Sequence, residues 1–228
     1  MIIEVIVQTV DDARAATDGG ADRLEVVRAI RDGGLTPAHS VVEAIKRATP
    51  LPLRVMVREN AGFDTSDAEI EKMRAAAWNL TKLGVDGLVA GFAKSGELSL
   101  PEFEAVIEAA PGVPVTFHRA FDSLSNPRAA IDVLATNPRI DRILTSGGHG
   151  PAEERCTHLR EYVASAGSRL AIIAGGGVDV EMFRSLVAQR IVREIHVGRA
   201  AREGGNDEGP VSAASVRRLR DLADSQAG

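Results

Sequence analysis

The sequence predicts an α/β protein, a single (β/α)8 barrel of the TIM type. Eight short β-prone runs alternate with eight helical segments along 228 residues. The β-prone runs are almost continuously apolar, as is typical of parallel strands that are covered on both faces. Their spacing of roughly thirty residues matches one βα unit. This count in a chain of this length favours a closed barrel over an open doubly wound sheet, with one domain over residues 1–228.

The predicted strands are apolar or β-branched runs bounded by turn residues, mostly glycine and proline. The run that ends at Phe117 leads directly into polar residues, and the last three runs are each followed by glycine or Ser-Gly. The predicted strands are Ile2–Val7, Arg23–Val27, Leu51–Val57, Gly87–Ala90, Val113–Phe117, Arg142–Thr145, Leu170–Ala174 and Glu194–Val197.

Start and stop signals bound the predicted helices. Gly19-Gly20 ends the first helix, Ser66 and Asp67 cap the third, and Pro101 occupies the first turn of the fourth. The predicted helices are Val10–Gly19, Ser40–Arg47, the segment from Ser66 to Gly84, Pro101–Ala110, a helix that opens at Asn126-Pro127, Ala152–Ala166, Val180–Arg190 and Ser212–Ala223.

Composition narrows the class of protein. Hydrophobic residues make up 44% of the chain, charged residues make up 26%, and the net charge is −5. Since there is no basic run, we expect no nucleic acid partner. The single cysteine, Cys156, excludes an internal disulfide and indicates a reducing compartment. The chain opens directly into a strand, and no apolar run approaches membrane-spanning length, so we expect a cytoplasmic protein with no membrane partner.

Polar residues gather at the predicted strand ends, which meet at one mouth of a barrel. His118, Arg119 and Asp122 directly follow an apolar strand, with Thr116 and His118 on the face opposite Phe117. Glu4 and Glu25 lie inside apolar strands, where an unpaired carboxylate is costly. We therefore expect both to face the barrel interior and to pair with Arg54, Arg58 or Arg119. The candidate catalytic residues are Glu4, Glu25, Arg58, His118, Arg119 and Asp122; the alternative is a structural ion-pair network around an ordinary buried histidine.

Several segments, taken in order, resemble the CutC family, which is named for a role in copper homeostasis. The resemblance extends over nearly the whole chain and implies a TIM-type barrel. The segments are Ile3–Val5, Gly19–Glu25, Gly33–Pro37, Val55–Arg58, Thr116–Asp122, Asp141–Gly148 and Gly175–Val178.

Two positions depart from the family pattern. The resemblance implies cysteines just after each of the first two glutamate motifs, and here these places hold Ile6 and Val27. Cu(I) prefers sulfur ligands, and Cys156 and His158 do not share a helical face. Copper is thus implied by the family name alone, and we predict no tight Cu(I) binding by the monomer. A divalent metal held by Glu4, Glu25 and His118 stays open.

Glycine turns follow the last two predicted strands. Gly198-Arg199-Ala200 resembles the turn of phosphate-binding barrels, and Gly175–Gly177 follows the preceding strand. Glycines allow backbone N–H groups to approach an anion. The candidate anion-binding residues are Ser146, Gly147, Gly175, Gly176, Gly177, Gly198 and Arg199.

Three functions stay open: a copper-handling protein, an enzyme and a non-catalytic binding barrel. As an enzyme, it would use Glu25 or Glu4 as a base and His118 as an acid on a small phosphorylated or carboxylated substrate, as an isomerase, epimerase or lyase. No lysine stands at a strand end, which disfavours a Schiff base. We expect a small anionic ligand as the partner, and a homodimer stays open.

Overall fold

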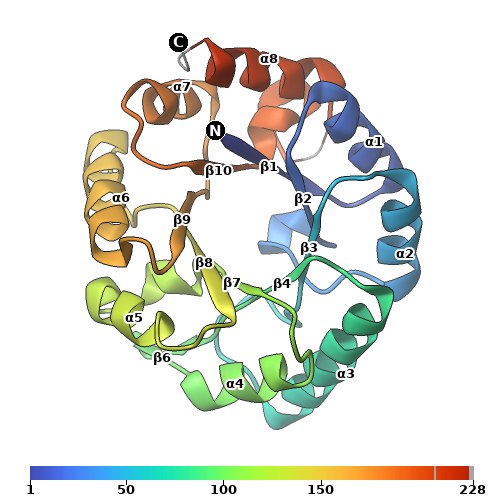
Figure 1. Ribbon diagram of the computed structural model, residues 1–228, viewed down its shortest axis with the longest axis vertical. Helices are drawn as coiled ribbons and strands as arrows, with labels where there is room; N and C mark the ends of the chain where they lie inside the picture. Colours follow the sequence, from blue (N-terminus) through green and yellow to red (C-terminus); the bar gives the residue numbers. More distant parts are fainter. Residues whose placement is uncertain (208, 226–228) are drawn as a thin grey trace.

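The computed structural model describes residues 1–207 and 209–225. Figure 1 shows a closed ring of strands surrounded by a ring of helices. The ring closes because the last strand pairs with the first in parallel, with Glu4 opposite His196. Within the described residues its strands are β1 (Ile2–Val7), β2 (Arg23–Val26), β3 (Leu53–Met56), β4 (Gly87–Ala90), β7 (Val115–Phe117), β8 (Ile140–Thr145), β9 (Ala171–Ala174) and β10 (Glu194–Val197).

Helices cover the outside of the ring, so the predicted (β/α)8 barrel is confirmed. The third helix shows why the local signals succeed: Ser66 and Glu69 form a capping box at its start, and Gly84 ends it with a φ of +67°. None of the described helices is long and apolar enough to cross a lipid bilayer. The helices are α1 (Val10–Gly19), α2 (His39–Ala48), α3 (Asp67–Leu83), α4 (Leu100–Glu108), α5 (Pro127–Leu134), α6 (Ala152–Ala166), α7 (Val180–Ala188) and α8 (Ala213–Asp224).

Short elements that the sequence pattern did not predict follow the carboxyl ends of several strands. A two-stranded hairpin, β5 (Ala93–Lys94) and β6 (Glu97–Leu98), follows β4. Such elements are too short to show a periodic pattern. The 3-10 turns are η1 (Ile30–Asp32), η2 (Arg119–Ser123), η3 (Arg199–Ala201) and η4 (Glu203–Gly205).

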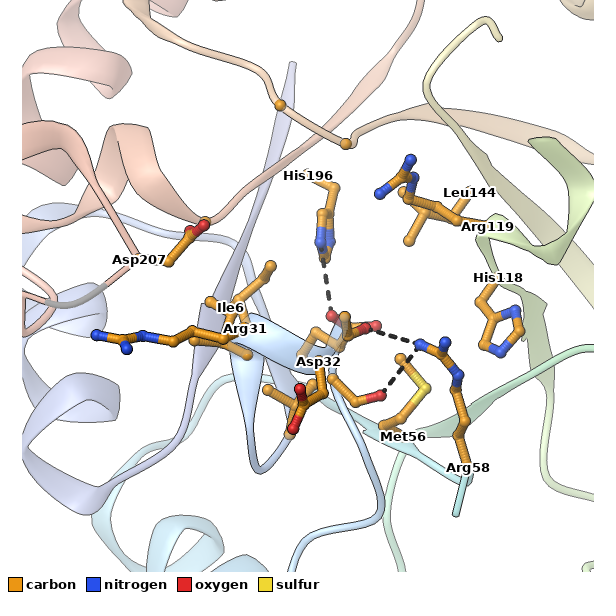
Figure 2. A pocket seen from close by; sticks show the side chains of 18 of the residues that line it. Ile6, Arg31, Asp32, Met56, Arg58, His118, Arg119, Leu144, His196 and Asp207 are labelled. Atoms are coloured by element: carbon orange, nitrogen blue, oxygen red, sulfur yellow. Dashed lines mark hydrogen bonds and ion pairs between the residues drawn. The ribbon is translucent and has the colours of Figure 1, made fainter. Parts of the chain in front are cut away.

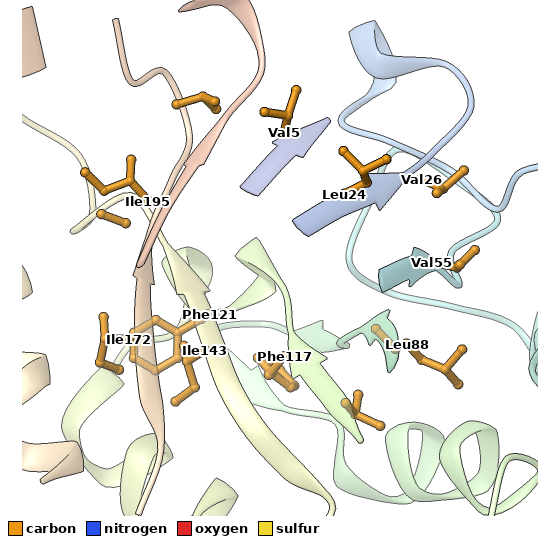
Figure 3. Close-up of a cluster of buried hydrophobic side chains, with 14 of the residues drawn as sticks. Val5, Leu24, Val26, Val55, Leu88, Phe117, Phe121, Ile143, Ile172 and Ile195 are labelled. Carbon is orange, nitrogen blue, oxygen red and sulfur yellow. The ribbon is translucent and has the colours of Figure 1, made fainter. Parts of the chain in front are cut away.

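The main apolar core lies between the ring and the helices. In β1, every second residue (Ile3, Val5 and Val7) belongs to this core, because alternate side chains of a strand point to opposite faces. Leu24 and Ile195 belong to it too, and Figure 3 shows them on β2 and β10, the two strands that pair with β1 on either side. Helix residues such as Phe103 complete it, with the ring of Phe103 lying 5.3 Å from that of Phe117.

The opposite face of the strands points into the barrel and is largely charged. Arg23 of β2 donates to Glu4 and, over 2.6 Å, to Oε2 of Glu194. Arg142 of β8 donates to the same Glu194 oxygen at 2.9 Å, and Arg54 of β3 donates to Oδ1 of Asp141 at 2.8 Å. Arg142 also pairs with Asp141. We call Glu4, Arg23, Glu194, Arg142, Asp141 and Arg54 the interior ion network.

Candidate functional site

A cavity of about 440 Å³ opens at the carboxyl ends of the strands. Its polar lining comes from strand ends far apart in the sequence, and Figure 2 shows His196, His118, Arg58 and Arg119 around it. Because carboxyl ends converge at this face, the barrel alone accounts for their meeting. The lining residues are Ile6, Glu25, Val27, Ile30, Arg31, Asp32, Gly33, Gly34, Met56, Arg58, Ala61, Phe63, His118, Arg119, Leu144, Gly176, Gly177, Val178, His196, Gly198, Arg199 and Asp207.

A buried histidine links the two predicted glutamates. His196 Nδ1 lies 2.8 Å from Oε1 of Glu4, and its Nε2 lies 3.5 Å from Oε2 of Glu25. Burial opposes a charge on the imidazole, but Glu25 and Glu4 together raise the pKa of His196. Burial alone would raise the pKa of Glu4, but Arg23 and His196 outweigh this effect and hold the pKa well below the usual range. Glu4 is therefore a fixed anion that makes the neighbouring His196 easier to protonate.

Glu25 differs from Glu4 because it lacks an arginine partner among the described residues. Burial raises its pKa to about 7, with His196 opposing the shift and Glu4 adding to it. Its Oε1 is buried and makes no hydrogen bond with any described residue. Glu25 lines the cavity, whereas Glu4 lies behind His196 and does not. The expected pairing of the glutamates with Arg54, Arg58 or Arg119 is wrong, because the strand register places Arg23 directly opposite Glu4.

His118 is held as a neutral imidazole with a defined tautomer. The N–H of Ala120 donates to its Nδ1 at 3.1 Å, so the ring proton resides on Nε2. Burial, and then the charge of Arg58, lower the pKa of His118 to about 3. Nε2 is buried without a hydrogen-bond partner among the described residues. Gly91 leaves room for the ring, because a Cβ there would lie 2.8 Å from Nδ1.

Arg58 forms no ion pair with an acidic residue in the described part of the chain. Its guanidinium donates to the carbonyl oxygens of Gly33, Gly34, Ala61 and Gly62. It also lies over the ring of Phe63, 4.9 Å from the centroid. Burial and then the charge of Arg119 lower its pKa. Carbonyl dipoles hold the cation in position without cancelling its charge, which favours an anion in the cavity.

Arg119 lies beside the glycine turn after β9. Its Nε donates to Oδ2 of Asp122 at 3.0 Å, and its side chain is half exposed. A Cβ at Gly176, which has a φ of +81°, would lie 2.5 Å from that Nε. Glycine is thus needed there for the backbone conformation and for the close approach of the guanidinium.

Some predicted site residues lie outside the cavity. Asp122 accepts from Oγ1 of Thr145 at 2.6 Å and from the N–H of Ser146, so it fixes the loop that carries Arg119. The N–H of Gly147 donates to Oγ1 of Thr145, and the N–H of Gly175 donates to the carbonyl oxygen of Thr145. Ser146, Gly147 and Gly175, which were predicted to bind an anion, therefore do not line the cavity, and their N–H groups are already bonded. Of that predicted set, Gly176, Gly177, Gly198 and Arg199 line the cavity.

The ligand sets proposed for metals are not assembled. Among residues 1–207 and 209–225, no group of three or more His, Cys, Asp or Glu could hold a metal ion. Both oxygens of Glu4 are engaged by Arg23 and His196, and Cys156 is buried in the outer core. Met56 supplies the only sulfur among the lining residues described, and one thioether does not make a Cu(I) site.

The candidate residues predicted from the sequence include neither His196 nor Arg23, although both contact Glu4. A usable signal exists, because Arg23 and Glu25 share a strand face, as do Glu194 and His196. Charged residues spaced by two within apolar strands indicate an inward polar face.

The barrel architecture and the cavity of mixed charge define this chain as a (β/α)8-barrel protein with a polar cavity at the carboxyl face of its strands. It belongs to the CutC family, whose sequence profile matches residues 1–201. A CutC family protein of Xanthomonas campestris is 37% identical over 216 residues, which cover 93% of this chain and 86% of that protein. A protein of Homo sapiens named copper homeostasis protein cutC homolog is 35% identical over 208 residues, covering 90% and 76%.

A solved structure shows the same architecture. The crystal structure of a CutC protein from Streptococcus agalactiae superimposes with a TM-score of 0.80 at 26% identity, covering 87% of this chain and 98% of that one. The family resemblance and the fold are thus both confirmed.

Proposed function

We propose that this protein is an enzyme that abstracts a proton next to a carbonyl group of a small carboxylated or phosphorylated substrate. Isomerases, epimerases and some lyases use this step. One observation carries the proposal: Glu25 Oε1 and His118 Nε2 are both buried, both lack a hydrogen-bond partner among the described residues, and both residues line one cavity. An acceptor and a donor left free in a shared cavity suit a substrate that supplies both partners.

Glu25 is the general base of this proposal. A pKa of about 7 leaves a large fraction ionised at neutral pH while making the carboxylate a stronger base than an exposed glutamate. Its Oε2 faces His196, so Oε1 remains for the substrate. Glu4 and Arg23 act behind His196 by fixing the position and charge of its ring.

His118 stabilises the negative charge that develops on the substrate oxygen. With a pKa of about 3 it is neutral at physiological pH, so it donates a hydrogen bond from Nε2 rather than delivering a proton as an imidazolium. A neutral imidazole of this kind is suited to polarise a carbonyl group. The role of proton-donating acid first considered for His118 is replaced by that of a fixed donor.

Arg58 and Arg119 supply the positive potential for the anionic group of the substrate. Both line the cavity, and Gly176 and Gly198 line it on the adjoining strands. A carboxylate could be held by the arginines, and a phosphate by the arginines together with the backbone N–H groups of the glycine turns.

The test is exchange of a carbon-bound proton with solvent. We would incubate the protein in D2O with small 2-oxo and 2-hydroxy carboxylates and with sugar phosphates, and follow the α-proton by NMR. The parent protein should exchange the α-proton of at least one class. Glu25→Gln should reduce the rate by roughly 10²–10⁴-fold, and His118→Gln by roughly 10²–10³-fold.

Glu161→Gln is the matched control, because Glu161 lies on the surface in a pair with Arg128. It should exchange at the parent rate. Equal exchange rates in the parent and in Glu25→Gln would show that Glu25 is not the base. Binding of these anions without any exchange would favour a non-catalytic binding barrel.

The connection with copper homeostasis comes from the names of relatives such as the human protein. The donor set of this cavity does not fit Cu(I), because Ile6 and Val27 occupy the two positions where the family resemblance implies cysteine. A role of this chain in copper homeostasis would therefore act through the small molecule it converts. That the monomer does not bind Cu(I) tightly stays a prediction, and a competition titration against a Cu(I) chelator tests it.

A further inference from the structure

One side of the cavity is apolar. Ile6, Val27, Ile30 and Met56 line it and, together with Val89 behind them, form a cluster separate from the main core. We call Ile6, Val27, Ile30 and Met56 the apolar wall. Val27 and Met56 are buried, whereas Ile6 and Ile30 are half-buried. Figure 2 shows Ile6 and Met56 at the edge of the cavity.

The residues of the apolar wall lie close to Glu25 and Arg58, which are proposed to bind the substrate. Ile6 lies opposite Glu25 in the register of β1 and β2. Val27 follows Glu25 by two residues, and Met56 precedes Arg58 by two, so each pair projects from the same face of its strand. A substrate held by Glu25 and Arg58 would therefore place any further substituent against this wall.

Two glycines keep the space over the wall open. A Cβ at Gly34 would lie 3.1 Å from Cγ1 of Val27 and 3.5 Å from Cε of Met56. A Cβ at Gly198 would lie 3.1 Å from Cδ1 of Ile6 and 3.7 Å from Cδ1 of Ile30. Side chains at either glycine would press on the wall.

We infer that the apolar wall is a subsite for an apolar substituent, so that the substrate is a small carboxylate or phosphate carrying a short alkyl chain or similar group beside its carbonyl. This inference rests on the proposed function and names the class of its substrate. The physical reason is that a substituent on this wall removes apolar surface from water on both sides. A purely polar substrate would leave the half-buried Ile6 and Ile30 facing water.

The experiment measures affinity against chain length by calorimetry. The probes are straight-chain carboxylates from acetate to octanoate, monoalkyl phosphates of the same lengths, and the corresponding alcohols. For the anionic head group that fits, each added methylene should tighten binding about fourfold until the wall is covered, which corresponds to ~0.8 kcal/mol per buried CH2. The alcohols should show the same slope at lower affinity, because they lack the charge that Arg58 attracts.

Variants of the wall give matched comparisons. Val27→Thr and Met56→Gln keep approximate size and add polarity, so each should flatten the slope while leaving acetate or methyl phosphate binding unchanged. Met56→Leu stays apolar and should keep the slope. Ile6→Thr changes a half-buried residue and provides a second polar variant if Val27→Thr fails to fold.

The outcomes separate the subsite from the proposed function. Anions that bind with no dependence on chain length would overturn the subsite and leave the anion-binding enzyme standing. Alcohols that bind as tightly as the anions, with a steep slope, would support the subsite and contradict the proposed role of Arg58. Absence of binding by all three series would contradict both.

Discussion

Glu4 and Glu25 show how two identical side chains in one barrel acquire different chemistry. Both are buried and both contact His196, but only Glu4 also meets Arg23. A cation in direct contact favours the ionised carboxylate, whereas burial without one favours the protonated carboxyl group. The pKa of Glu4 is therefore lowered and that of Glu25 is raised to about 7.

Glu25→Gln should stabilise the protein at high pH. Because the folded-state pKa of Glu25 lies above the unfolded value, the folded state binds this proton more tightly, and stability is lost as pH rises from about 4.5 to about 7. The glutamine variant has no proton to lose there. Its Tm should exceed that of the parent by a few degrees at pH 8, and the difference should shrink at pH 5. A constant difference between the two pH values would mean that burial does not raise the pKa of Glu25.

His118 should stay neutral while His196 titrates. The pKa of His118 is lowered to about 3 and that of His196 is raised. Two-dimensional NMR of protein with ¹⁵N-labelled histidine should show one ring with a fixed Nε2–H tautomer from pH 5 to 8. His118→Gln assigns that signal. Appearance of an imidazolium at His118 near pH 6 would remove the argument for a neutral donor.

At the scale of elements, one side chain ties two loops of the cavity together. Arg58 at the end of β3 bonds to carbonyls of residues 33 and 34 after η1 and of residues 61 and 62 after its own strand. A lysine cannot span these acceptors, because its donors radiate from a single nitrogen. The η1 loop thus owes its position to a residue that also binds the proposed anion.

Arg58→Lys should therefore loosen the η1 loop. We expect faster amide hydrogen exchange for residues 30–36 and a loss of roughly 1–3 kcal/mol in the free energy of unfolding. The control is Arg28→Lys, because Nε of the exposed Arg28 donates to a single carbonyl, that of Thr36, at 2.7 Å. Exchange that is equally fast in both variants would show that the four carbonyl bonds of Arg58 do not hold the loop.

Local sequence patterns predicted the helices and strands well, but not which side chains pair between neighbouring strands. Thr116 and His118 were expected on one strand face and Phe117 on the other. Thr116 indeed accepts a hydrogen bond from Arg54 inside the barrel, while Phe117 packs on Phe103 outside it. The partner of Glu4 was mispredicted because the register between two strands depends on tertiary packing, which a single sequence does not display.

At the scale of the whole molecule, the interior ion network fills the barrel where branched aliphatic residues are common. Glu194 is its centre, since one oxygen accepts from both Arg23 and Arg142. The sequence shows the charges, but only the closed ring brings β2, β8 and β10 close enough to share them. We therefore expect the loss of a member of this network to destabilise the barrel.

Glu194→Gln should lower the free energy of unfolding by about 3–5 kcal/mol, because it removes the counter-charge shared by the buried Arg23 and the partly buried Arg142. Urea titration measures this change. Asp132→Asn is the control: its ion pair with Arg169 is exposed, and it should unfold near the parent midpoint. If the two variants unfold at the same urea concentration, the network does not stabilise the barrel.

The contact between Glu4 and His196 also bears on how the protein is made. These residues are 192 positions apart, so Glu4 leaves the ribosome long before its partner is translated. Until β10 pairs with β1, the nascent chain has two open sheet edges, which are prone to pair with other chains. It also lacks the histidine that Glu25 faces. A product that stops before β10 would keep both edges unpaired, so we expect it to aggregate more readily than the complete barrel.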